Sequence, residues 1–132
     1  MSLPLTSLTT ALLMMGYMAL TVRIMLLRRQ HNISLMDGDN PHFQRLLRAQ
    51  GNFAEYMPFA LLALLLLELQ GAAFLPLSLL AATLVVGRAS HAYGLLIGEP
   101  NYKDFRGRVF GMVCTWTPLG IMAVWLCLIS LV

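Results

Sequence analysis

Four long apolar stretches constrain this chain more than any other feature. They cover approximately residues 3–29, 41–70, 73–97 and 106–131. Each is long enough to cross the hydrocarbon core of a bilayer, which takes about 20 helical residues. In lipid the backbone must satisfy its own hydrogen bonds, and a helix does so within one segment. The pattern therefore predicts an all-α fold, a single-domain integral membrane four-helix bundle.

The composition and the N-terminal stretch support this interpretation. Only 11% of the residues are charged, whereas soluble domains carry roughly 25%. The first stretch has no basic residue in front of it, and Arg23, Arg28 and Arg29 lie near its end. That polarity is wrong for a cleavable signal peptide, so we expect the stretch to remain as a helix. Cys114 and Cys127 lack ligand-like spacing, which argues against a metal site or disulfide framework.

Basic residues are confined to two regions of the chain. All nine Lys and Arg residues lie between Arg23 and Arg108, in the loops after the first and third helices or in the adjoining helix ends. The positive-inside rule predicts that both loops face the cytoplasm and both termini lie on the non-cytoplasmic side. A charge of +3 distributed in this way indicates a membrane-facing role, not nucleic-acid binding.

A polar stripe enters the second helix within RLLRAQGNFAEYMP, residues 45–58. Arg48, Asn52 and Glu55 are spaced four and three residues apart, so they share one helical face. The helix then continues as FALLALLLLELQ, which is apolar enough to lie in lipid. Polar groups at that depth are costly unless they have partners or line a wet cavity. The stripe is therefore the first candidate for a functional site.

The depths of two charged residues predict a contact between helices. Glu55 lies about 10 Å beyond Arg48, and Arg88 on the third helix lies about 13 Å from its inner end near residue 97. An isolated charge at such a depth is expensive. We therefore expect Glu55 and Arg88 to pair or to share a ligand, and both a structural and a ligand-binding role for Arg88 stay open. His91 lies one turn from Arg88.

A basic rim surrounds this end of the chain, and it has two interpretations. Its residues are Arg28, Arg29, Arg45, Arg48, Lys103, Arg106 and Arg108. They could be topology anchors that snorkel to headgroups. They could also bind a ligand, because arginines hold carboxylates bidentately while amides and carboxylates hold amide and ammonium groups. A small zwitterionic peptide of net negative charge fits, and a guanidinium would favour the thiolate of any thiol it carried.

The block from Arg48 to Pro58, RAQGNFAEYMP, resembles the signature of the MAPEG superfamily, the membrane-associated proteins in eicosanoid and glutathione metabolism. Members include microsomal glutathione transferases and leukotriene C synthase. The resemblance rests on the RAQ-x-N-x-x-E-Y-x-P pattern together with four spans, and it covers nearly the whole chain. The short loops are similar to those of the bacterial branch, which implies a bacterial inner membrane.

The resemblance implies a homotrimer with glutathione, the co-substrate, bound between neighbouring subunits near the cytoplasmic face. By position, the residues that would bind or support glutathione are Arg28, Arg29, Arg48, Asn52, Glu55, Tyr56, Arg88 and His91. Arg106 would stabilise the thiolate, with Arg108 as the alternative. The spacings Gly94/Gly98 and Gly107/Gly111 would permit close helix packing.

The chain departs from the family pattern on the third helix. His91 and Leu95 stand where we align two tyrosines of the family, and Tyr93 is offset from that face. His91 could replace a tyrosine as donor to a glutathione carboxylate. The departure bears on catalysis more than on fold or binding.

Three functions remain open from the sequence. The first is a glutathione transferase, with peroxidase activity as a further option, acting on lipophilic electrophiles or lipids from the bilayer. The second is a non-catalytic lipid- or glutathione-binding member of the same superfamily. The third is a small proton-coupled multidrug transporter that uses Glu55 as its proton carrier. The position of Glu55 on the second helix, beside Asn52 and Arg48, argues against the third.

Overall fold

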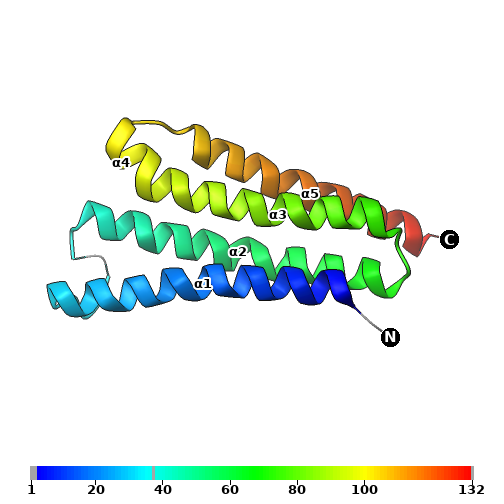
Figure 1. The fold of residues 1–132 in the computed structure, drawn as a ribbon, viewed down its shortest axis with the longest axis horizontal. Helices are drawn as coiled ribbons and strands as arrows, with labels where there is room; N and C mark the ends of the chain where they lie inside the picture. Colours follow the sequence, from blue (N-terminus) through cyan, green and yellow to red (C-terminus); the bar gives the residue numbers. More distant parts are fainter. Residues whose placement is uncertain (1–2, 37, 132) are drawn as a thin grey trace.

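The chain folds into four long helices that run side by side (Figure 1). The computed structural model describes residues 3–36 and 38–131, and every side chain among them except that of Tyr102. The long helices are α1 (Pro4–His31), α2 (Pro41–Leu69), α3 (Phe74–Tyr93) and α5 (Arg106–Ser130). A π-helical turn, Gly94–Gly98, and the short α4 (Glu99–Tyr102) extend α3. The predicted all-α fold is confirmed.

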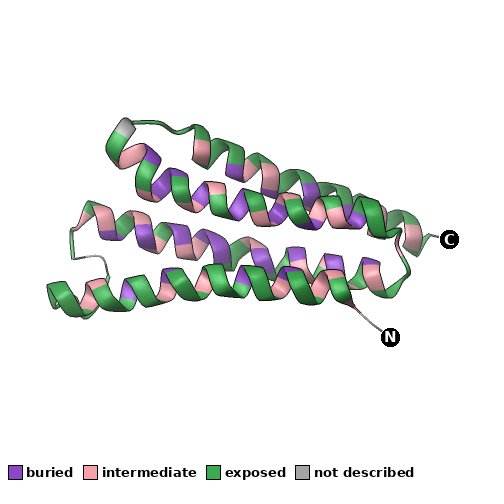
Figure 2. Ribbon diagram, in the orientation of Figure 1, coloured by how far each residue is buried: buried purple, intermediate pink, exposed green. Residues whose placement is uncertain are grey.

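All four spans are long and apolar enough to cross a membrane. The buried side chains lie on the faces that the helices turn toward one another, while the outward faces stay exposed (Figure 2). Leu46, Leu64 and Leu84 are fully buried, whereas Met15 and Phe59 are 61% and 70% exposed. Large apolar side chains on an outer surface are typical of contact with lipid or with further subunits.

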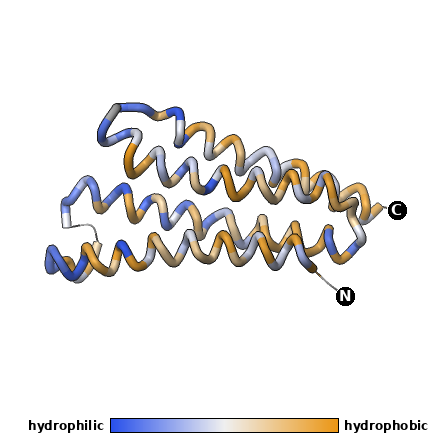
Figure 3. The backbone as a smooth tube through the Cα atoms, viewed as in Figure 1, coloured by the Kyte–Doolittle hydropathy of each residue, from blue (hydrophilic) through white to orange (hydrophobic). Residues whose placement is uncertain are grey.

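The two ends of the bundle differ in polarity. The described parts of both termini lie at one end, together with the turn between α2 and α3 (Figure 1). The α1–α2 connection and the α4–α5 loop lie at the opposite end, where hydrophilic residues gather (Figure 3). The two basic connections therefore lie at one end of the bundle and the described parts of the termini at the other, as the distribution of charge predicted. Which side of the membrane each end faces stays a prediction.

The helical region that begins with α3 is longer than the sequence predicted. The predicted third helix ends near residue 97, and Glu99-Pro100-Asn101 in the following loop is typical of a turn, but the chain stays helical to Tyr102. The π-helical turn makes this possible, because the N–H of Glu99 bonds to the carbonyl of Gly94, five residues back. Pro100 then falls in the first turn of α4, where its missing N–H costs least. The chain reverses only after Tyr102.

Helices α3 and α5 pack closely through glycines. A Cβ added at Gly111 would lie 2.5 Å from the backbone nitrogen of His91, and one at Gly87 would lie 2.8 Å from Cβ of Cys114. Gly94 and Gly107 also face each other across this interface. The expected close packing at Gly94, Gly107 and Gly111 is confirmed, but within one chain. The fourth predicted residue, Gly98, approaches the carbonyl of Asp104 in the α4–α5 loop instead.

Side-chain caps fix both ends of the α1–α2 pair. Asn40 stands at the start of α2 as its N-cap. The Asn40 side chain accepts hydrogen bonds from the N–H groups of His42 and Phe43, at 3.0 and 3.2 Å. At the other end, the Glu68 carboxylate accepts from the N–H groups of Leu5 and Thr6, at 3.0 and 2.8 Å. The last turn of α2 therefore caps the first turn of α1.

Candidate functional site

The centre of the site is a buried network built around Arg88. Its guanidinium donates through Nη1 to Oδ1 of Asn52 and through Nη2 to Oγ1 of Thr115. Nη2 also lies 3.3 Å from the carbonyl oxygen of Gly111. Arg88, Asn52 and Thr115 are all buried. One guanidinium on α3 thus joins α2 and α5.

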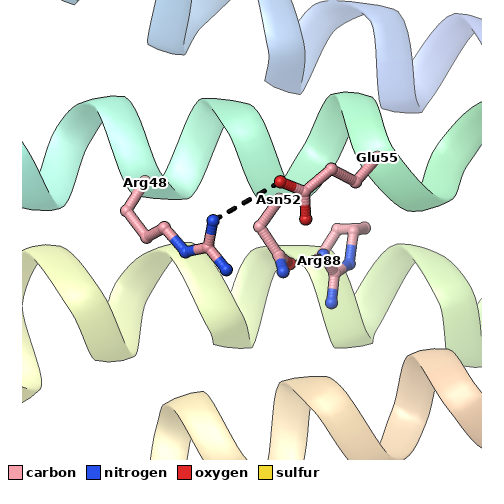
Figure 4. Close-up of polar contacts among 4 residues, drawn as sticks. All are labelled: Arg48, Asn52, Glu55 and Arg88. Carbon is pink, nitrogen blue, oxygen red and sulfur yellow. Dashed lines mark hydrogen bonds and ion pairs between the residues drawn. The ribbon is translucent and has the colours of Figure 1, made fainter.

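The predicted pairing of Glu55 with Arg88 is wrong. Oε1 of Glu55 instead lies 3.4 Å from Nη1 of Arg48, and these two side chains are 50% and 65% exposed (Figure 4). Asn52, midway between them on the same face of α2, is the residue that reaches Arg88. A neutral amide therefore supplies the acceptor at the buried position, and the carboxylate stays on the outer surface of α2 beside Arg48. The alternative, a shared ligand, stays a prediction.

Tyr56 and His91 flank this network. The Arg88 guanidinium carbon lies 5.9 Å from the centre of the half-buried Tyr56 ring, within the range of a cation–π contact. His91 is 4% exposed and packs against Gly111, and Leu95 is 3% exposed. His91 and Leu95, which we align with family tyrosines, therefore face the interior of the bundle.

Arg28 and Arg29 differ in their surroundings. Nη1 of Arg28 lies 3.5 and 3.4 Å from the carbonyl oxygens of Ile33 and Ser34, and its guanidinium lies 5.0 Å from the centre of the Phe43 ring. Arg28 therefore holds the α1–α2 connection against the start of α2. Arg29 is exposed and has no hydrogen-bond or ion-pair partner in the part of the chain that the structure describes.

The two arginines that open α5 also differ. Nη1 of Arg108 lies 3.1 Å from Oε1 of Glu99, whose side chain is only 11% exposed. Arg106 is exposed, and its backbone N–H bonds to the Asp104 carboxylate at 2.9 Å. Among the described residues, the guanidinium of Arg106 has no partner and does not contact the Asn52–Arg88 network. Arg106 is thus the freer of the two cations.

Thr115 is the member of the network that the sequence did not single out. It is fully buried on α5, and its hydroxyl also donates to the Gly111 carbonyl at 2.8 Å. A threonine in a membrane helix usually satisfies its hydroxyl in this local way, so its type and position gave no signal of a second role. Only the fold places it beside Arg88.

The site therefore has two layers at the polar end of the bundle. The inner layer, Asn52–Arg88–Thr115, is buried and fixes the relative position of three helices. The outer layer, the Arg48–Glu55 pair, is exposed and presents one positive and one negative group on α2. Such a pair can bind a ligand that carries both a carboxylate and an ammonium group.

Comparison with known proteins agrees with these observations. "Inner membrane protein YecN" of Escherichia coli K12 is 33% identical over 115 residues, which cover 87% of this chain and 82% of the relative. YecN of Escherichia coli O6:H1, strain CFT073, matches with the same identity and coverage. No solved structure matches the chain with statistical significance.

The homology to an inner membrane protein and the four apolar helices identify an integral protein of the inner membrane. The model of the MAPEG family matches residues 6–128, nearly the full length. The match includes the whole Asn52–Arg88–Thr115 network and the Arg48–Glu55 pair above it. The chain therefore belongs to the MAPEG family.

Proposed function

We propose that this protein is a membrane-bound glutathione transferase that conjugates the glutathione thiolate to lipophilic electrophiles. The observation that carries the proposal is the exposed Arg48–Glu55 pair, which stands over the buried Asn52–Arg88 contact. An exposed ion pair contributes only about 0–1 kcal/mol to stability. Two charges on a span that is otherwise apolar therefore fit a binding role better than a structural one.

Glutathione matches this pair chemically. It carries two carboxylates and one ammonium group, so Arg48 can hold a carboxylate while Glu55 accepts from the ammonium group or an amide N–H. Tyr56 follows Glu55 directly and already lies against Arg88. The buried network would keep α2 in place when the ligand separates Arg48 from Glu55. In this role Arg88 supports the site without contacting the peptide.

In the reaction, the thiolate sulfur attacks the electrophilic carbon and forms a C–S bond, and a leaving group departs or the acceptor takes up a proton. A guanidinium near the sulfur favours the thiolate over the thiol. We assign this role to Arg106 because Arg108 is already paired with Glu99. The resemblance to the MAPEG superfamily implies glutathione bound between the subunits of a homotrimer, so we assign the role to Arg106 of a neighbouring subunit.

The exposed apolar faces of the helices support such an assembly, since they need either lipid or further subunits to cover them. We further propose that the polar end faces the cytoplasm and both termini face the opposite side, as the distribution of basic residues predicts. Glutathione would then approach Arg48 from the aqueous phase, and the electrophile would arrive through the bilayer.

A second candidate is a glutathione- or lipid-binding protein without catalytic activity. The burial of His91 and Leu95 favours it, because interior side chains at these positions cannot contact the peptide as tyrosine hydroxyls would. The transporter hypothesis gains no support, because Glu55 is paired with Arg48 on the same helix instead of standing alone as a proton carrier.

Glutathione titration of the purified protein, followed by calorimetry, tests the binding proposal. We expect Arg48→Ala to weaken binding by tenfold or more, since a hydrogen bond to a charged group is worth about 1.5–3 kcal/mol. Arg45→Ala is the matched control, because it removes the same charge one turn earlier on α2, and it should bind like wild type. Equal affinities for all three proteins would remove the site assignment.

The ultraviolet absorbance of the thiolate separates the two candidates. For a transferase we expect this absorbance to rise when glutathione is added to wild-type protein, and to rise much less with Arg106→Ala. Binding without any thiolate signal would establish the non-catalytic alternative instead.

A further inference from the structure

A cavity of about 250 Å³ lies between α1 and α3. Small residues line it from both helices, namely Gly16 and Ala19 on α1 and Ala89 and Ala92 on α3. Their side chains are too short to fill the space between the helices, which leaves an apolar groove at membrane depth. Neither Arg48 nor Glu55 lines it.

Two arginines interrupt the apolar lining, and each has an unmet need for an acceptor. Arg23 on α1 is exposed, and it has no hydrogen-bond or ion-pair partner among the residues that the structure describes. Arg88 on α3 is 2% exposed, and its Nε has no acceptor although both Nη atoms are satisfied. A buried donor without an acceptor costs about 1–3 kcal/mol. The cavity therefore combines apolar walls with the unpaired cation of Arg23 and one buried donor atom, Nε of Arg88, that lacks an acceptor among the described residues.

We propose that this cavity binds one acyl chain of an anionic phospholipid, with the phosphate held by Arg23. The walls suit a hydrocarbon chain. The volume is below the roughly 300–1,000 Å³ of pockets that enclose drug-sized ligands, so the groove can hold part of one chain and not a whole lipid. The second chain would remain in the bilayer.

The position of Arg23 supports a phosphate as its partner. Arg23 lies eight residues before the end of α1 at His31, about 12 Å below the polar end of the helix. A long arginine side chain can rise from that depth toward the headgroups.

This lipid site is distinct from the proposed glutathione site, although the buried Arg88 belongs to both. It lies between α1 and α3, whereas the Arg48–Glu55 pair is on α2. Arg23 has no part in the glutathione assignment. A failure of one proposal therefore leaves the other standing.

Native mass spectrometry of the full-length protein in mild detergent tests the site, with phosphatidylglycerol and phosphatidylcholine as the two probes. We expect wild type to bind phosphatidylglycerol more tightly. Arg23→Gln should weaken phosphatidylglycerol binding about fivefold, the effect of one arginine near an anionic surface. Its affinity for phosphatidylcholine should fall less, because the choline cation offsets the charge of the phosphate, and its affinity for glutathione should not change, which shows that the variant is folded.

Two further variants locate the effect. Arg45→Gln removes the same charge at the same end of the bundle but does not line the cavity, so it should keep the affinity of wild type. Ala19→Leu fills the cavity from α1 and should weaken the binding of both phospholipids while glutathione binding persists.

Three results would overturn the proposal. Equal losses for Arg23→Gln and Arg45→Gln would indicate a diffuse basic surface instead of a site. Unchanged lipid binding by Ala19→Leu would place the lipid elsewhere. Disulfide cross-linking of Ala19→Cys between two copies of the chain in membranes would show that another subunit, and not lipid, covers the groove.

Discussion

The guanidinium of Arg88 on α3 donates a hydrogen bond to the side-chain oxygen of Asn52, 36 residues earlier on α2. Both residues are buried, and Asn52 stands between two charged neighbours that are exposed. The polar stripe of α2 is therefore divided in two. Asn52 faces inward and joins α2 to α3, while Arg48 and Glu55 stay exposed on α2.

Replacing Asn52 should destabilise the protein more than replacing its charged neighbours. In Asn52→Ala the buried Arg88 loses an acceptor, and we expect the free energy of unfolding to fall by about 1–3 kcal/mol. Arg48→Ala removes only an exposed pair and should change it by less than about 1 kcal/mol. Circular dichroism during titration with SDS in mixed micelles measures both. If the two variants are equally stable, Arg88 does not depend on Asn52.

The glycine contact between α3 and α5 gives a second prediction. Gly111→Ala places a methyl group where the His91 backbone and the Gly87 carbonyl already lie, so the helices must move apart. We expect a loss of about 1–3 kcal/mol, typical of overpacking. Gly120→Ala is the control on the same helix, because nothing lies within 4 Å of its added Cβ. A thermal melt that shows no difference between the two variants would contradict the close packing.

Exchanging the charges of the surface pair should separate stability from binding. The double variant Arg48→Glu/Glu55→Arg can rebuild the ion pair, so its stability should stay within about 1 kcal/mol of wild type. Each position would then carry a charge of the same sign as the glutathione group that it is proposed to hold. The two would repel each other, and calorimetry should detect no binding. Retained affinity would show that glutathione binding does not depend on which of the two positions carries the positive charge.

The cap between α2 and α1 gives a prediction about the other end of the bundle. Glu68→Gln keeps one acceptor oxygen but loses the negative charge at the start of α1. We expect a loss of about 0.5–2 kcal/mol, the range for helix caps and charge–dipole contacts. The exposed Gln70→Ala, two residues away at the same end, should leave stability unchanged. Faster hydrogen exchange limited to the first turn of α1 in Glu68→Gln would be the direct sign of the lost cap.

Most of the fold could be read from the order of the residues. Long apolar runs leave a chain in lipid few options other than helices, so the four spans and their approximate limits follow from composition and length. The prediction failed at Glu99-Pro100-Asn101. This tripeptide is typical of turns, but the π-helical turn before it moves Pro100 to a position that a helix tolerates.

The candidate site was only partly predictable, and the reason is geometric. Spacing places Arg48, Asn52 and Glu55 on one face of α2, but it does not say which of the three points at a neighbouring helix. Their charges suggested that Glu55 would meet Arg88, and the structure gives that contact to the neutral Asn52. Thr115 could not be found in advance, because α5 begins 18 residues after Arg88 in the sequence and its rotation is set by the glycine contact with α3.

The sequence by itself determined that the chain lies in a lipid bilayer, how many spans it has and at which end its charges gather. These are properties of single segments, because the free energy of placing a helix in lipid depends on that helix alone. The tertiary structure alone decided which polar groups are partners. Partnership depends on the rotation and offset of packed helices, and contacts such as those of Gly87 and Gly111 fix these only once two segments meet.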